Sequence, residues 1–224
     1  MNWESDLPIP VPEKPDDRRP CTVGLTGGLA TGKSTVARIL DARGIPVFDA
    51  DASVHELYEP NGAGAAAVAD LFGPSVLDAE GGVVRASLSE IVLGNADARL
   101  RLENAIHPLV RRAVEEWLVS ISDRPVAVVE AALLAETGYH TEYDVLMVVW
   151  CDQHQQLQRA LERGVPAERA RALINAQLPM AEKKELADVL VDNRGDFEDL
   201  PSEVDRAWSL VHRLCAHLAE RENV

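Results

Sequence analysis

The sequence has 224 residues, a length that suits one compact α/β domain with insertions. Acidic residues outnumber basic ones by 37 to 22, which gives a formal net charge of −15. Because binding to nucleic acid requires a basic surface, this balance argues against a nucleic-acid partner. It still permits an anionic small substrate, since a few basic side chains can reverse the field inside a cleft.

The cysteines, Cys21, Cys151 and Cys215, are far apart in the chain and have the spacing of neither a metal site nor a disulfide framework. We therefore expect reduced thiols. The N-terminal segment lacks the apolar core of a signal peptide, and no apolar run approaches the length that spans a membrane. These features predict a soluble cytoplasmic protein without a membrane partner.

Residues 1–20 contain five prolines among charged residues, a composition typical of a disordered tail. Beyond this tail we expect buried β-strands at Cys21–Thr26, Ile45–Asp49, Val126–Glu130, Val145–Cys151 and Val189–Val191. Helical patterns separate several of these runs, notably at Lys33–Arg43 and Gln153–Arg163. Largely apolar strands that alternate with helices predict a doubly wound α/β core with a parallel sheet.

Two stretches interrupt this alternation. Residues 53–124 contain no convincing strand and include a clear helical pattern near Pro108–Ile121, which indicates a helical insertion after the second strand. A second helical and highly charged stretch, Pro166–Leu186, lies between the fourth and fifth strands.

The segment from Gly27 to Ser34 fits the phosphate-loop pattern G-x-x-x-x-G-K-[ST] in the required strand–loop–helix setting. Its glycines let backbone N–H groups face a phosphate, and the start of the following helix adds further donors. Lys33 supplies charge to the β- and γ-phosphates, and the Ser34 hydroxyl can coordinate Mg²⁺. We expect ATP to be bound by Gly27, Gly28, Leu29, Ala30, Thr31, Gly32, Lys33, Ser34 and Thr35.

A GTPase would also need the patterns D-x-x-G and N-K-x-D. Asp78–Gly81 matches the first pattern but lies inside the helical insertion, and Asn193–Asp196 has Arg where the second requires Lys. Neither segment supports a GTPase.

Two acidic residues, Asp49 and Asp51, follow the second expected strand. The carboxyl ends of parallel strands face the ligand crevice, so both acids should lie near the γ-phosphate and point the same way unless the backbone turns. A carboxylate there can accept the proton of an attacking hydroxyl or hold Mg²⁺. An Asp before Ala-Ser-Val-His-Glu can equally be a helix N-cap, and these residues alone leave both roles open.

From Thr22 to Leu200 the sequence resembles the dephospho-coenzyme A kinase family. The resemblance is carried by VGLTGGLATGKSTVARIL and GIPVFDAD, and by four later segments: Leu102–Pro108, Leu133–Glu136, Gln156–Arg159 and Ala187–Gly195. It implies a phosphotransferase that uses ATP and Mg²⁺ to phosphorylate the ribose 3′-hydroxyl of dephospho-CoA, the last step of coenzyme A biosynthesis. It also implies a P-loop kinase fold with a doubly wound, five-stranded parallel sheet, a helical substrate-binding insertion and a helical lid.

This resemblance divides the chain by function. The nucleotide-binding core would comprise residues 21–52, 125–152 and 187–224, following the tail at 1–20. Residues 53–124 would form the substrate domain for CoA, and residues 153–186 would form the lid.

By matching positions, the resemblance makes Asp51 the base that orients or deprotonates the 3′-hydroxyl. Arg159 would stabilise the transferring phosphoryl group, and Arg163 would contact phosphates from the lid. Two cations at i and i+4 repel each other, which favours a nearby anion, although surface ion pairs with Glu162 or Asp152 remain an alternative.

Three further residues have open roles. His107 and Arg85 are candidate contacts to dephospho-CoA, with a capping or core role and a salt bridge as their respective alternatives. Asn193 would lie near the adenine, or would serve as a turn residue. The metal would be held by Ser34, with Asp49 as a further candidate.

The chain departs from the family pattern at two positions. Ala30 replaces a usual glycine, and because alanine resists positive φ we expect a slightly altered affinity for ATP. Ala132 replaces a usual proline, which leaves open whether Glu130 reaches the Mg²⁺ site. Rival functions are a kinase of another small acceptor, such as a nucleoside monophosphate, and a nucleotide-dependent regulatory protein.

Overall fold

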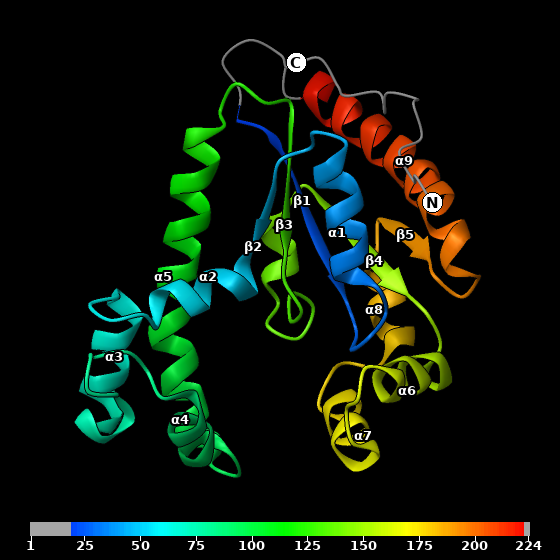
Figure 1. Cartoon of the computed structure of the whole chain (residues 1–224). Helices are drawn as coiled ribbons and strands as arrows, with labels where there is room; N and C mark the ends of the chain where they lie inside the picture. Colours follow the sequence, from blue (N-terminus) through cyan, green and yellow to red (C-terminus); the bar gives the residue numbers. More distant parts are fainter. Residues whose placement is uncertain (1–18, 222–224) are drawn as a thin grey trace. The chain divides into compact units, whose positions relative to one another are not determined.

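The computed structural model describes residues 19–221, so the expected tail at 1–20 lies almost wholly outside the described residues (Figure 1). The chain forms two compact units. Unit 1 contains the described residues up to Phe48 and from Ile121 onward, and unit 2 is Asp49–Ser120.

Unit 1 is built on a five-stranded sheet with the order β2-β3-β1-β4-β5. Its strands are β1 (Cys21–Gly27), β2 (Val47–Asp49), β3 (Val126–Glu130), β4 (Val145–Trp150) and β5 (Val189–Asp192). β1 pairs in parallel with both β3 and β4, and β4 pairs in parallel with β5. The expected α/β fold with a parallel sheet is confirmed, and the apolar runs of β3 and β4 are buried as central strands require.

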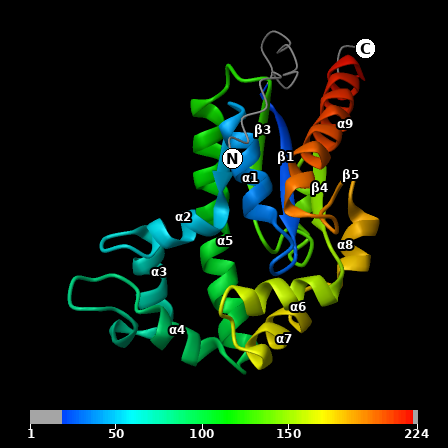
Figure 2. The ribbon, with the colours of Figure 1, turned by 45° about the vertical axis from the view of Figure 1, so that its right-hand side comes forward.

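The helices of unit 1 are α1 (Lys33–Ala42), α6 (Gln153–Glu162), α7 (Ala167–Asn175), α8 (Met180–Leu186) and α9 (Leu200–Arg221), with short 3₁₀ turns at Tyr139–Glu142 and Phe197–Asp199. α1 and α9 contact each other beside the sheet (Figure 1). With one face of the sheet they form the main core, in which Trp208 is fully buried. α6 contacts α7, and α8 lies against β4 (Figure 2). This packing places the start of α1 at the carboxyl end of β1.

The loop between β1 and α1 contains a strained residue. Ala30 has a φ of +57°, the left-handed region that the sequence expectation singled out as unfavourable for alanine. The side chain is buried against Ala160 of α6 and Ala170 of α7. A left-handed conformation costs an L-residue about 1–2 kcal/mol, so the fold tolerates strain at this position.

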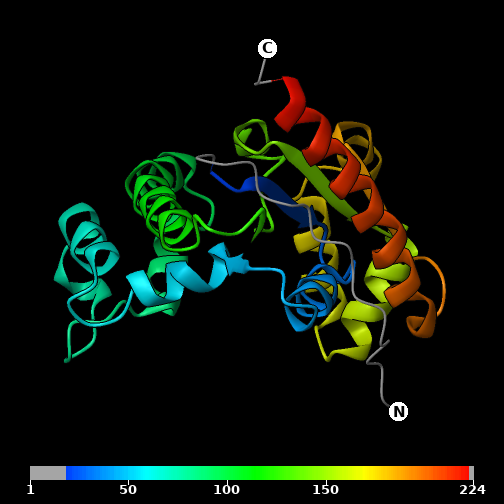
Figure 3. The same cartoon turned by 90° about the horizontal axis from the view of Figure 1, so that it is seen from above.

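Unit 2 is helical: α2 (Ala50–Leu57), α3 (Ala63–Phe72), a 3₁₀ turn at Pro74–Val76, α4 (Arg85–Val92) and α5 (Ala96–Ser120). α2, α3 and α4 all contact α5. Figure 3 shows these helices, coloured from cyan to green, from above. Their small core contains Val68, Val76, Leu88 and Ile106. Among the described residues of this unit, the β-type pairing is a single antiparallel bridge between Leu77 and Val83.

The helix expected near Pro108–Ile121 begins earlier in the structure than the sequence pattern indicated. α5 starts at Ala96, where the side chain of Asn95 accepts a hydrogen bond from the N–H of Ala98, and it runs through Pro108. Pro108 cannot donate to the carbonyl four residues earlier, so it weakens the helix locally. Burial of Ile106 and Val114 on either side of Pro108 explains why tertiary packing keeps the helix continuous.

The expectation of reduced cysteines is wrong for two of them. Cys21 at the start of β1 and Cys215 near the end of α9 form a disulfide, with their Cα atoms 5.8 Å apart. The two residues are separated by 194 positions, so no local spacing could reveal the pair. Cys151 is a free, buried thiol.

None of the described helices combines the length and the hydrophobicity that a membrane-spanning helix needs.

The strain at Ala30 predicts the effect of Ala30→Gly. The substitution relieves the left-handed conformation, but it also adds entropy to the unfolded chain and removes one buried methyl group, so the stability should stay within about 0.5 kcal/mol of the wild type. Urea unfolding followed by circular dichroism measures this difference. The matched control is Ala37→Gly inside α1, which should destabilise the protein by about 1 kcal/mol. Equal destabilisation by both substitutions would contradict strain at Ala30.

Candidate active site

The phosphate loop joins β1 to α1 and ends at Gly32, the N-cap of α1, whose φ is +99°. The N–H groups of the first turn of α1 therefore lie at the helix end that attracts anions. Inside the loop, the hydroxyl and the N–H of Thr31 both donate to the carbonyl of Gly28, at 3.0 and 3.3 Å. These contacts close the loop into a compact turn.

Two glycines of the loop lie so close to side chains of later segments that an added Cβ would force those side chains to move. A Cβ added to Gly28 would lie 2.3 Å from Nε2 of Gln156, and one added to Gly32 would lie 2.3 Å from Nδ2 of Asn193. The loop is thus packed tightly against α6 and against the segment after β5.

Lys33 and Ser34 meet the same carboxylate. Nζ of Lys33 lies 2.7 Å from Oε1 of Glu130, and the Ser34 hydroxyl donates to the same oxygen at 2.8 Å. Glu130 is the last residue of β3 and is only 4% exposed. The alanine at position 132, where the family usually has proline, therefore does not prevent Glu130 from reaching Ser34.

These oxygens fit a magnesium ion. Mg²⁺ prefers hard oxygen ligands, and here a serine hydroxyl and a buried carboxylate oxygen adjoin at the start of α1. Sequence reasoning left Glu130 undecided, although its place at the carboxyl end of a central strand was the available signal.

Asn193 connects the segment after β5 to the phosphate loop. Its Nδ2 donates to the carbonyl of Thr31 at 2.7 Å, and the side chain is 6% exposed. Nη2 of Arg159 donates to the carbonyl of Asn193 at 2.9 Å. Arg159, Asn193 and Thr31 thus form a chain of hydrogen bonds from α6 to the loop.

Among the described residues, Arg159 forms no ion pair with Asp152 or Glu162, the alternative partners that the sequence suggested. Asp152 caps the N-terminus of α6 by accepting from the N–H of Gln155, and Glu162 accepts from the side chain of Gln158. Arg163 is an exposed residue at the C-cap of α6. In the described part of the chain, Arg159 is therefore the one of the two arginines whose side chain is connected to the loop by hydrogen bonds, through Asn193.

Cys151 lies beside this chain of hydrogen bonds. Burial raises the pKa of its thiol to about 11, although the positive charge of Arg159 acts in the opposite direction. A thiol with this pKa stays protonated and unreactive at neutral pH.

Two glutamines hold the middle of the phosphate loop. Gln156 of α6 donates to the carbonyl of Leu29 at 2.9 Å, and Oε1 of Gln177 accepts from the N–H of Leu29 at 2.8 Å. Gln156 is 2% exposed. Sequence reasoning assigned neither residue to the site, and a buried glutamine on a helix is not distinguishable from an exposed one by pattern alone.

In unit 2, the helix α2 starts earlier than expected. It begins at Ala50, and the side chain of Asp49 caps it by accepting from the N–H of Ala52 at 2.8 Å. The capping role considered for Asp51 therefore belongs to Asp49. The backbone turns between the two acids, so the extended chain that would give them a common direction is not present, and Asp51 lies in the first turn of α2.

Asp51 lines a cavity of about 380 Å³ within unit 2. Its walls are formed by α2, α4 and α5 through Asp51, Val54, His55, Tyr58, Arg85, Leu88, Ser89, Val92 and Leu102. Burial raises the pKa of Tyr58, and the positive charge of Arg85 opposes this shift. Asp51 and Arg85, predicted separately, thus share one cavity.

His107 has a different position from these two residues. It lies on α5 next to Pro108 and does not belong to the residues that line this cavity. His107 does not cap the start of a helix, one of the roles considered for it, because α5 begins eleven residues earlier, at Ala96.

Comparison with known proteins gives one consistent family. The family model described as Dephospho-CoA kinase matches residues 21–199. A dephospho-CoA kinase of Thermobifida fusca is 38% identical over 192 residues, covering 85% of this chain and 96% of the relative. One of Cutibacterium acnes is 41% identical over 193 residues, covering 84% of each chain.

Solved structures agree with this result. A Thermus thermophilus protein superposes with a TM-score of 0.72 at 30% identity, covering 91% of this chain and 98% of that one. Dephospho-CoA kinase from Campylobacter jejuni superposes with a TM-score of 0.57 at 25% identity, covering 87% and 97%. With a matching fold, a phosphate loop and a family model that spans both units, the chain belongs to the dephospho-CoA kinase family.

Proposed function

We propose that this chain transfers the γ-phosphoryl group of ATP to the ribose 3′-hydroxyl of dephospho-CoA, which gives CoA and ADP in the last step of coenzyme A biosynthesis. The observation that carries the proposal is the cluster of Lys33, Ser34 and Glu130 at the phosphate loop of a chain with this family membership. The family uses ATP and dephospho-CoA as its substrates.

The donor side of the reaction would lie in unit 1. The phosphates of ATP would bind the N–H groups of the loop and of α1, with Lys33 neutralising the β- and γ-phosphates. Mg²⁺ would be held by the Ser34 hydroxyl and the Glu130 carboxylate, and it would supply further neutralisation of phosphate charge. Asp49 is the weaker candidate for the metal because its carboxylate already caps α2.

Arg159 would act on the transferring phosphoryl group from α6. Its guanidinium is anchored to the carbonyl of Asn193 by one nitrogen, Nη2, while Nη1 is buried and has no hydrogen-bond acceptor among the described residues. A guanidinium with unused donors suits the charge that develops on the phosphoryl oxygens. Arg163 would add a phosphate contact, and Asn193 would lie near the adenine.

The acceptor side would use the cavity of unit 2. Asp51 would orient or deprotonate the 3′-hydroxyl, because a carboxylate within hydrogen-bond reach of a hydroxyl can accept its proton. Arg85, in the same cavity, would pair with an anionic group of dephospho-CoA. His107 stays a candidate contact to the acceptor, and the cytoplasmic location stays a prediction from sequence.

Acceptor specificity tests this function most simply. Purified protein with ATP and Mg²⁺ should release ADP when dephospho-CoA is added and should respond far less to a panel of nucleoside monophosphates. Coupled detection of ADP measures the rates. A response only to nucleoside monophosphates would assign the chain to the rival kinase class. Slow hydrolysis that ignores every acceptor would favour a regulatory protein.

Asp51→Asn tests the role of the proposed base. The substitution should leave the Kd for ATP unchanged and lower kcat by about 10²–10⁴-fold, the usual contribution of general-base catalysis. Steady-state kinetics and direct ATP titration separate the two effects.

The matched control is Asp49→Asn, two residues away. Asparagine caps a helix about as well as aspartate, so this variant should keep its stability, and its kcat should fall far less than that of Asp51→Asn. Normal turnover by Asp51→Asn, or an equal loss in both variants, would show that Asp51 is not the base.

A further inference from the structure

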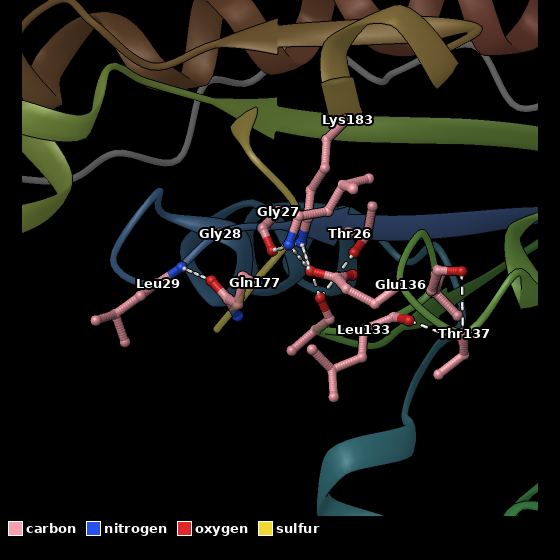
Figure 4. Close-up of polar contacts among 12 residues, drawn as sticks. Thr26, Gly27, Gly28, Leu29, Leu133, Glu136, Thr137, Gln177 and Lys183 are labelled. Carbon is pink, nitrogen blue, oxygen red and sulfur yellow. Dashed lines mark hydrogen bonds and ion pairs between the residues drawn. The ribbon is translucent and has the colours of Figure 1, made fainter. Parts of the chain in front are cut away.

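Lys183 of α8 is a fully buried charged side chain, with 0% of its surface exposed. Its Nζ lies 2.7 Å from Oε1 of Glu136 and donates to the carbonyls of Gly27 at 3.1 Å and Ala132 at 3.3 Å (Figure 4). An ammonium group has three donors, and these three acceptors can use all of them. A buried lysine is costly unless it is paired in this way.

Glu136, in the segment after β3, is the partner that balances this charge. Its Oε1 also accepts from the N–H of Leu178 at 3.0 Å, whereas its Oε2 is buried and no described residue donates to it. Burial lowers the pKa of Lys183, although the hydrogen bond and charge of Glu136 act to raise it. The ion pair joins α8 to the segment after β3. Through the further hydrogen bonds of its two members, it also holds the phosphate loop at Gly27 and the segment before α8 at Leu178.

The contact with Gly27 is at the first residue of the phosphate loop. Because a peptide unit is planar, a hydrogen bond that fixes the carbonyl of Gly27 also fixes the direction of the N–H of Gly28. Gln156 and Gln177 hold the next peptide groups at Leu29. Side chains of residues 153–186 thus hold the first part of the loop backbone at three successive peptide units, and Figure 4 shows the contacts of Lys183 and Gln177.

We propose that Lys183, oriented by Glu136, is a positioning residue that fixes the first turn of the phosphate loop and thereby sets the affinity for ATP. This inference deepens the proposed kinase function and rests on it only for the identity of the donor nucleotide. Lys183 does not touch the nucleotide in this account; it acts through the backbone of Gly27.

Two variants distinguish an effect on the position of the loop from an effect on the stability of the fold. One variant removes the charge of Lys183 alone, and the other removes the charges of both Lys183 and Glu136. Lys183→Met leaves Glu136 buried without its counter-charge, so this variant should lose much of its thermal stability. The double variant Glu136→Gln/Lys183→Met buries no net charge and should regain most of the melting temperature. The carbonyl of Gly27 still lacks its donor, so the Kd for ATP should stay about tenfold above that of the wild type.

The measurements are the melting temperature, the Kd for ATP by direct titration without acceptor, and the KM for each substrate. In the double variant, the KM for ATP should rise with its Kd, while the KM for the acceptor should stay unchanged. A merely structural role would lower the amount of folded enzyme and kcat without changing either KM.

Lys184→Met is the matched control, because it removes a neighbouring lysine of the same helix whose ammonium lies 4.7 Å from the centre of the Trp150 ring. It should bind ATP like the wild type. A folded double variant with wild-type affinity for ATP would overturn the inference. If the double variant does not fold, Glu136→Gln alone decides: its Kd should rise about threefold, and an unchanged Kd would overturn the inference.

The ATP titrations contain no acceptor, so their outcome does not depend on which acceptor the enzyme uses. A wrong acceptor assignment would appear in the acceptor panel and leave the ATP titrations intact. Normal phosphorylation of dephospho-CoA, combined with normal ATP binding by the variants, would remove the role of Lys183 and leave the proposed function standing.

Discussion

A single buried carboxylate oxygen, Oε1 of Glu130, holds the centre of the phosphate site. It accepts from both Lys33 and Ser34, so the first turn of α1 is tied to the end of β3. The sheet register makes this possible, because Glu130 pairs with Leu25 on β1, the strand that leads directly into the loop. A buried carboxylate is stable only when such donors satisfy it. The hydrogen bonds from Lys33 and Ser34 to Glu130 therefore fix the geometry of the site.

The loop is held from its other side by side chains that come later in the chain. Gln156, Gln177 and Lys183 bond to its backbone, and Asn193 bonds to it from the segment after β5. These contacts explain how the loop can retain a left-handed alanine at position 30. The phosphate site thus depends on segments between β4 and α9 as much as on its own glycines.

Sequence patterns predicted the features that depend on residues close together in the chain. The strands were predictable because buried parallel strands are continuous apolar runs, and the phosphate loop because its glycines and Lys33 have fixed spacing. Tertiary contacts determine the rest. Burial keeps α5 helical through Pro108, the fold brings Cys21 to Cys215, and Asp49 rather than Asp51 caps α2. Lys183 lies in a charged stretch, where pattern alone predicts an exposed residue, and only the packing of α8 reveals its burial.

The dependence of activity on Mg²⁺ in Glu130→Gln tests the central role of Glu130 most directly. Glutamine keeps an oxygen for Lys33 and Ser34 but loses the charge that would hold the metal. The account predicts that half-maximal kcat will need about tenfold more Mg²⁺ than in the wild type, the scale on which weakened metal sites respond. An unchanged Mg²⁺ dependence, with normal ATP affinity, would show that Glu130 organises the loop without holding the metal.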